Sequence, residues 1–194
     1  SGRDGTGDFH TLGTDNHRGA MLAVNHLLDL GHRCIAHVGF APSEFHSVSG
    51  RESGWRDALV ARGITPEPSW VAQADISAES GWRATRELLA RGVPFTALFV
   101  GNDTVAFGAL RALREAGRRV PDDVAVVGYD DLPLAPFAEP PLTTVRTDPI
   151  RHGREAMEML LALMAGQGGE VAHREIGAAL VVRASCGTRL ESRT

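Results

Sequence analysis

Three polar side chains each follow a short apolar run that is typical of a buried β-strand. In chain order they are Arg51, Asn102 and Asp130. Ligands of open α/β sheets bind outside the carboxyl ends of the strands, so we expect these side chains at one edge of a sheet. A guanidinium donates through a fixed fork, a carboxylate accepts from two hydroxyls, and an amide does both. Such a set suits a ligand dense in vicinal hydroxyls, or the edge of a purine.

Each of these side chains also has a simpler, local interpretation. Asn102 could only cap a helix, and Asp130 could only belong to a turn. Arg51 could be a solvated residue in the first turn of its helix. The neighbouring acids, Asp103 and Asp131, are more typical of capping or solvated positions. The sequence alone leaves these alternatives open.

Motifs of catalysis and metal binding are missing from the sequence. It contains no H-E-x-x-H, no G-x-S-x-G and no glycine-rich phosphate loop. The cysteines, Cys34 and Cys186, have no second ligand at metal spacing. The adjacent acids Asp130 and Asp131 could do acid–base chemistry, but neighbours in a loop seldom converge on one reacting atom. We therefore expect no catalytic residue, no metal, no cofactor and no enzyme.

Helical and strand patterns alternate with a period of about 30 residues, which is the length of a βαβ unit. Capping residues and glycines bound the helices, and the strands are continuously apolar, as strands covered on both faces are. The class is therefore α/β with a doubly wound parallel sheet. We expect helices at about 17–30, 48–62, 78–91 and 103–117, and strands at about 35–38, 70–74, 96–100 and 124–127.

The alternation stops after Asp131, where prolines break any regular element. Beyond this loop we expect a strand over 143–146, a helix over 149–164 and a last strand over about 176–182. The helix has an apolar face, and we expect that face to be exposed and to favour self-association. Its members are Met157, Leu160, Leu161 and Met164.

Composition restricts the partners and the compartment. The net charge is −4, whereas a chain that grips duplex DNA by itself usually has a basic face. No apolar run approaches the ~18 residues that span a bilayer. The first residues lack the apolar segment of a signal peptide, and residues 1–13 suggest a linker or a remnant of cloning. We expect a cytoplasmic protein with reduced cysteines and no membrane contact.

Ordered motifs from about residue 14 to residue 189 resemble the LacI/GalR family of transcription regulators. The most specific one is Val-Pro-x-Asp-Val-Ala-Val-Val-Gly-Tyr-Asp-Asp at 120–131. The others are Asp15-Asn16-x-x-Gly19, Val24-x-His26-Leu27-x-x-x-Gly31-His32, Arg51-x-x-Gly54-Trp55, Gly101-Asn102-Asp103, Pro141-Leu142-Thr143-Thr144-Val145 and Leu180-Val181-Val182-Arg183.

This resemblance implies a periplasmic-binding-protein-like (type I) fold with two lobes around a ligand cleft. The matched motifs begin in the middle of the family's chain. They imply most of the C-terminal lobe (about 15–138 and 175–189) and an N-terminal-lobe segment (about 143–166). The effector would be a sugar or a purine-like molecule. By motif it would meet Arg51, Asn102 and Asp130. By position it would also meet Ser47 and Ile76, and Phe45 could line the pocket. Ile76 departs from the aromatic residue that relatives often have there.

The resemblance further implies a homodimer, here through the helix over 105–116 and the loop over 132–137. Operator DNA would be bound only by an N-terminal helix-turn-helix that these residues do not contain. Two other functions remain as alternatives. One is a periplasmic sugar-binding protein of the ribose-binding type, which shares the fold. The other is an enzyme on a doubly wound sheet, which a fold never excludes.

Overall fold

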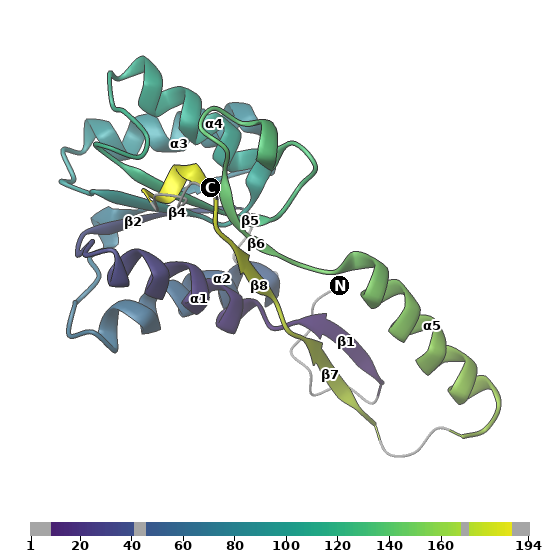
Figure 1. The fold of residues 1–194 in the computed structure, drawn as a ribbon. Helices are drawn as coiled ribbons and strands as arrows, with labels where there is room; N and C mark the ends of the chain where they lie inside the picture. Colours follow the sequence, from purple (N-terminus) through teal and green to yellow (C-terminus); the bar gives the residue numbers. More distant parts are fainter. Residues whose placement is uncertain (1–8, 41–45, 168–170, 188–194) are drawn as a thin grey trace, which may run out of the picture.

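A computed structural model describes residues 9–40, 46–167 and 171–187. A large sheet with helices on both faces makes up most of it, and a smaller unit extends from one edge (Figure 1). The strands are β1 Thr11–Thr14, β2 Ile35–Phe40, β3 Val71–Ala74, β4 Ala97–Val100, β5 Ala125–Asp130, β6 Thr143–Arg146, β7 His173–Ile176 and β8 Ala179–Val181. The α-helices are α1 Asn16–Asp29, α2 His46–Val60, α3 Ala78–Ala90, α4 Asp103–Glu115 and α5 Pro149–Met164.

The large sheet has the strand order β3-β2-β4-β5-β6-β8, and every pair but β6–β8 is parallel. Helices α1 and α2 cover one face, and α3 and α4 cover the other (Figure 1). Successive strand residues therefore enter different cores. Val126 packs into the core beneath α3 and α4, and Val127 into the core beneath α1 and α2. The predicted α/β class and doubly wound parallel sheet are confirmed.

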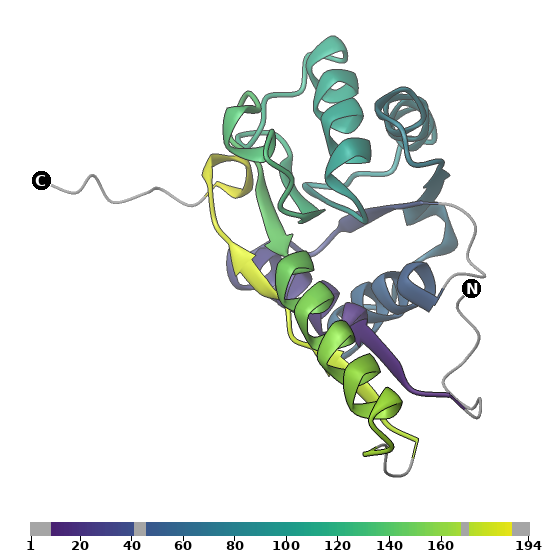
Figure 2. The ribbon, with the colours of Figure 1, turned by 90° about the vertical axis from the view of Figure 1, so that its right-hand side faces the viewer.

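The smaller unit consists of β1, its parallel partner β7 and α5 (Figure 2). Three short crossings join it to the large sheet: residue 15, residues 147–148 and residues 177–178. Strand β1 includes residues 11–13, so the prediction of a linker there was wrong. The segment Thr-Leu-Gly-Thr has one large apolar residue, and its pairing with β7 comes from tertiary context rather than from local pattern.

Two other expectations differ from the structure. The single strand expected over 176–182 is two strands, because the chain leaves the small sheet after Ile176 and joins the large sheet at Ala179. Strand β6 was expected beside α5, in the same segment. It lies instead inside the large sheet, between β5 and β8. The boundary expected at residue 143 therefore lies after Arg146.

The apolar face of α5 is exposed, as predicted. The exposed fractions are 54% for Met157, 49% for Leu160, 57% for Leu161 and 76% for Met164. No residue of this helix is buried among the described part of the chain. Other residues of the helix, among them Glu155, Glu158 and Met159, line the hollow toward β7, so the small sheet does not cover the apolar face.

His37 is a core residue of β2. It is 1% exposed and stacks between Trp55 and Phe99, with ring centroids 5.6 and 5.1 Å away. Its Nδ1 lies 3.0 Å from the carbonyl oxygen of Phe99, which can only accept, so Nδ1 carries the proton. Burial lowers the pKa of His37 to about 4 and keeps the ring neutral near pH 7.

This buried histidine makes the stability of the fold depend on pH. The unfolded chain binds a proton at His37 near pH 6.5 and the folded chain only near 4, so stability falls as the pH drops through this window. We predict that His37→Phe, which keeps a ring between Trp55 and Phe99, removes about 2 kcal/mol of the loss in unfolding free energy between pH 7 and pH 5. Urea unfolding of both proteins at the two pH values measures the difference. Equal losses in the two proteins would contradict the assignment.

Candidate functional site

The three polar side chains expected at one sheet edge do meet there. Arg51 projects from α2, Asn102 is the N-cap of α4, and Asp130 ends β5. These elements follow or end β2, β4 and β5, which are neighbours in the sheet. Arg51 Nη2 donates to Asp130 Oδ1 at 3.1 Å, and Asn102 Nδ2 donates to Asp130 Oδ2. The carboxylate of Asp130 thus joins the end of β5 to α2 and to the start of α4.

Asn102 has both of the roles that the sequence suggested. Its Oδ1 accepts from the backbone N–H of Thr104 at 2.8 Å, which caps α4. Its Nδ2 faces the other way and binds Asp130. The cap fixes the orientation of the amide, because the oxygen must face the helix. Capping and site formation are therefore one arrangement rather than alternatives.

Arg51 is held on every side and is only 7% exposed. Besides Asp130, its Nε donates to Asn16 Oδ1 at 2.9 Å, and its Nη1 donates to the carbonyl of Gly101. Its guanidinium carbon lies 3.7 Å from the centroid of the Tyr129 ring. Burial raises the pKa of Tyr129 to about 12, so the ring beneath the cation stays neutral at ordinary pH.

Sequence reasoning missed the contributions of Asn16 and Tyr129. Both Asp15 and Asn16 stand where a helix cap belongs, but only Asp15 is the cap, accepting from the N–H of Arg18 at 2.8 Å. Asn16 is the first helical residue, and its amide is free to hold Arg51. The doubled capping pair Asp-Asn was the available signal, since one helix needs one cap.

The site retains hydrogen-bonding capacity toward solvent. The side chains of Arg51 and Asp130 are 9% and 21% exposed. Three of the five N–H groups of Arg51 are used within the protein, so two remain. Each oxygen of Asp130 accepts one of these bonds and has a further lone pair. A hydroxyl placed between them can donate to the carboxylate and accept from the guanidinium.

Asp131 takes no part in this cluster. Its Oδ1 accepts from Arg183 Nη2 at 2.7 Å, and its Oδ2 accepts from Arg146 Nε at 2.6 Å. Burial alone would raise the pKa of Asp131, but the hydrogen bonds from the two arginines lower it below its usual value. The two adjacent acids thus face different partners, and they form no shared acid–base pair.

The remaining predicted site residues are not joined to this cluster. Ile76 lies in the loop after β3, the edge strand, and is 61% exposed. Ser47 lies in the first turn of α2, but its side chain is outside the described part of the structure. Phe45 lies outside the described residues. Their roles in ligand binding stay predictions.

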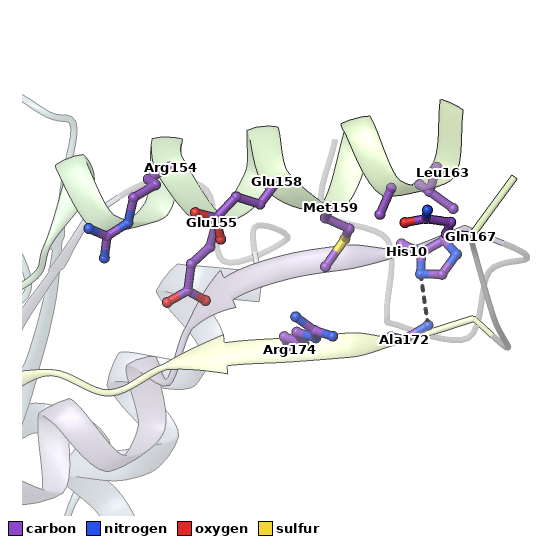
Figure 3. A pocket seen from close by; sticks show the side chains of 10 residues that line it. His10, Arg154, Glu155, Glu158, Met159, Leu163, Gln167, Ala172 and Arg174 are labelled. Atoms are coloured by element: carbon purple, nitrogen blue, oxygen red, sulfur yellow. Dashed lines mark hydrogen bonds between the residues drawn. The ribbon is translucent and has the colours of Figure 1, made fainter. Parts of the chain in front are cut away.

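A hollow of about 610 Å³ lies elsewhere, between α5 and β7. Figure 3 shows Glu155 on α5 pointing toward the strands, and Arg174 on β7, on the other side of the hollow. Its wall mixes charges of both signs, with Arg154 and Arg174 beside Glu155 and Glu158. A hollow of about 460 Å³ does adjoin the cluster, since Asn16 is part of its wall. That wall is made of Thr14, Asp15, Asn16, His17, Ser49, Gly50, Ser53 and Glu175.

The described residues contain no group of three or more His, Cys, Asp and Glu side chains that could hold a metal ion. In the same residues, every helix is too short or too polar to cross a membrane.

Comparison with known proteins identifies similar molecules. Residues 24–186 match the family described as periplasmic binding protein-like domain. The HTH-type transcriptional regulator CelR of Thermobifida fusca is 39% identical over 171 residues, which are 88% of this chain and 50% of that protein. The solved complex of transcriptional regulator CelR with cellobiose has a TM-score of 0.88 at 38% identity, over 92% of this chain and 54% of that one.

A second solved structure shows a similar protein in a larger assembly. The lac repressor dimer bound to operator and the anti-inducer ONPF has a TM-score of 0.87 at 34% identity, over 94% of this chain and 54% of that one. The similar proteins are transcription regulators, not enzymes. This chain spans about half the length of the curated relatives that it matches.

The many contacts of Arg51 predict that lysine cannot replace it. An ammonium group keeps the charge but cannot reach Asn16, Gly101 and Asp130 together, nor lie flat on the Tyr129 ring. We predict that Arg51→Lys lowers the free energy of unfolding by about 1–3 kcal/mol.

Urea unfolding measures this loss. The matched control is Arg56→Lys on the same helix, where the arginine side chain is 47% exposed and pairs with Glu52. That change should alter the free energy by less than about 0.5 kcal/mol. Equal losses in the two variants would show that Arg51 has no special structural role.

Proposed function

Because this chain belongs to the periplasmic binding protein-like effector domains of the LacI family of transcription regulators, we propose that Arg51, Asn102 and Asp130 bind a small polyhydroxylated effector, a sugar. The observation that carries the proposal is the carboxylate of Asp130. It is oriented by two donors, and it keeps one accepting lone pair on each oxygen. Vicinal hydroxyls of a sugar match that pair of acceptors, with the spare N–H groups of Arg51 beside them.

Similarity supports a sugar in particular. A regulator with 38% sequence identity and a TM-score of 0.88 forms a complex with cellobiose. The same donors and acceptors would also fit the edge of a purine, which is the second candidate ligand class. Members of the two classes differ in shape, so a panel of both distinguishes them.

We infer that the effector acts by shifting a population of conformations. A ligand that bound both arrangements of the two units equally would change nothing, however tightly it bound. Contacts from Arg51 and Asp130 would hold the ligand on the large sheet. Further contacts that form only in one arrangement would favour that arrangement. DNA would be bound by a helix-turn-helix segment of the whole protein, which would act in the cytoplasm.

We propose a second copy of this chain as the protein partner, through α4 and the loop over 132–137. The loop exposes two large apolar side chains, Leu134 at 64% and Phe137 at 84%. Exposed side chains of this size on a short turn are typical of contact surfaces. The similar lac repressor is a dimer in its complex with operator.

The ligand proposal predicts a change in melting temperature. Screening this chain against cellobiose, other disaccharides, hexoses, pentoses and purines should give at least one stabilising ligand. At a hundred times its Kd, that ligand stabilises the fold by about 2.7 kcal/mol. In Asp130→Asn one of the two side-chain atoms becomes a donor, so it cannot accept from both Arg51 and Asn102. We predict an affinity loss on the order of a hundredfold.

The control for this screen is Asp29→Asn, at the exposed end of α1, where the aspartate pairs with Arg62. It should leave the ligand-induced shift unchanged. Stabilisation that survives Asp130→Asn at full strength would remove the carboxylate from the site. If only purines stabilise the chain, the effector is a purine rather than a sugar.

The dimer proposal predicts that Phe137→Glu weakens self-association. The side chain is exposed, so the fold should be unaffected, while a charge at the centre of an apolar contact should raise the dimer dissociation constant by tenfold or more. Analytical ultracentrifugation measures the constant. Val60→Glu, at an exposed apolar position on α2, is the control that should leave it unchanged. Unchanged association in Phe137→Glu would place the contact elsewhere.

A further inference from the structure

The turn after β5 has an unfavourable backbone conformation. Asp130 and Asp131 have φ values of 105° and 53°, and they are consecutive residues with side chains in a region that favours glycine. Such conformations persist only where surrounding groups hold them. Since Asp130 is the centre of the candidate site, whatever holds this turn also positions the site.

Asp103, which the proposed function does not use, is bonded to this turn. Its side chain is buried, with an exposed fraction of 0% for the residue, in the first turn of α4. Its Oδ2 accepts from the backbone N–H of Leu132 at 2.8 Å. Its Oδ1 accepts from the hydroxyl of Thr144 at 2.7 Å, and that hydroxyl oxygen accepts from the N–H of Asp131 at 3.3 Å. One carboxylate thus holds the two residues that follow Asp130, one directly and one through Thr144.

Gly128 provides the space for this arrangement. A Cβ atom at that position would lie 2.2 Å from Asp103 Oδ1, closer than any real contact. A side chain at 128 would therefore displace the carboxylate from Thr144. Glycine at this place in the strand and Asp103 at the start of α4 act together, although they are distant in the sequence.

We propose that Asp103 is a positioning residue of the effector site, whose buried carboxylate holds the turn in the conformation that directs Asp130 toward Arg51, Asn102 and the ligand. The proposal rests on the proposed function for the meaning of the site. The hold on the turn is a separate property that needs no ligand. Asp103 has no exposed surface, so it acts through Asp130 and not by touching the effector.

The charge of Asp103 sets the strength of this hold. Burial raises the pKa of Asp103 to about 6, against the hydrogen bonds from Thr144 and Leu132, which lower it. The nearby charges are the carboxylates of Asp130 and Asp131, which raise the pKa of Asp103 further. Arg51 pairs with Asp130, and Arg146 and Arg183 pair with Asp131. These arginines keep the other two acids bonded while Asp103 titrates.

Protonation of Asp103 changes the direction of one hydrogen bond. The N–H of Leu132 can only donate, so the proton goes to Oδ1, which faces a hydroxyl that can also accept. The Thr144 oxygen then accepts from Asp103 as well as from the N–H of Asp131, and without the negative charge of Asp103 the link to Asp131 weakens. The hold on the turn is therefore strongest above pH 6 and weakens as the pH falls below it. Ligand affinity should follow the same pH dependence.

The first experiment is NMR spectroscopy of the chain without ligand, from pH 4.5 to 8. The amide proton of Leu132 should shift with a midpoint near pH 6, since it donates to the titrating carboxylate. Asp103→Asn should abolish that shift. It should also raise the three-bond HN–Hα coupling of Asp130, which is small at its positive φ and large in extended backbone. An unchanged coupling in this variant would overturn the proposal.

Thr144→Val is a second test, and it remains available if Asp103→Asn fails to fold. It removes the hydroxyl between Asp103 and Asp131 at nearly constant volume. The coupling of Asp130 should rise in this variant as well, while Leu132 keeps its titration. If the coupling of Asp130 is unchanged in both variants, Asp103 does not hold the turn.

The affinity for cellobiose, measured by calorimetry at pH 7.5 and 5.5, tests whether the bond from Asp103 to the turn affects ligand binding. Asp103→Asn should weaken binding by about tenfold at pH 7.5 and remove the difference between the two pH values. The control Asp122→Asn, an exposed acid before β5, should bind as the unaltered chain does. Affinity and pH profile unchanged in Asp103→Asn would overturn the proposal. Absence of cellobiose binding to the unaltered chain would count against this sugar alone, because the NMR test needs no ligand.

Discussion

The carboxylate of Asp130 is the group on which the arrangement of the site depends. It accepts from Arg51 and from Asn102, and so it ties the end of β5 to the elements that follow β2 and β4. Arg51 is nearly buried, and a cation withdrawn from water needs a charged partner of this kind. The donors and acceptors are consequently ordered before any ligand arrives. A preformed site loses less conformational entropy on binding than one that must be assembled.

The sequence was sufficient for the part of the site that follows from strand order. Three unambiguous apolar runs lie at the centre of the sheet, and the polar residues after them had to share one edge. Asn16, Tyr129 and Asp103 could not be found in this way. Each contacts residues that are 29 to 78 positions away in the sequence, and nothing in its local pattern indicates them. Asn16 resembled a second cap, and Asp103 resembled an ordinary acid in a first helical turn.

The elements that were predicted poorly are those with weak patterns of their own. The helices with caps and glycine ends, and the continuously apolar strands, were placed within a few residues. Strand β1 has one large apolar residue. Three of the four residues of β7 are polar and exposed, so each strand depends on the other for its pairing. The break between β7 and β8 likewise arises because β7 pairs in the small sheet and β8 in the large one. No local preference distinguishes a strand that changes sheets from one that continues.

Residues beside the three crossings to the smaller unit contact the site or the turn that carries Asp130. Asn16, which holds Arg51, directly follows the first crossing at residue 15. Arg146, which donates to Asp131, is the last residue of β6 before the second crossing. In the sheet it lies opposite Ala179, the first residue after the third crossing. Asp130 and Asp131 are neighbours in one strained turn, so a shift in one backbone affects the other. A ligand that changes the hold on Arg51 and Asp130 would therefore act on the residues beside all three crossings, without a long chain of intermediates. In this view, the conformation of a single turn links effector binding to the position of the smaller unit.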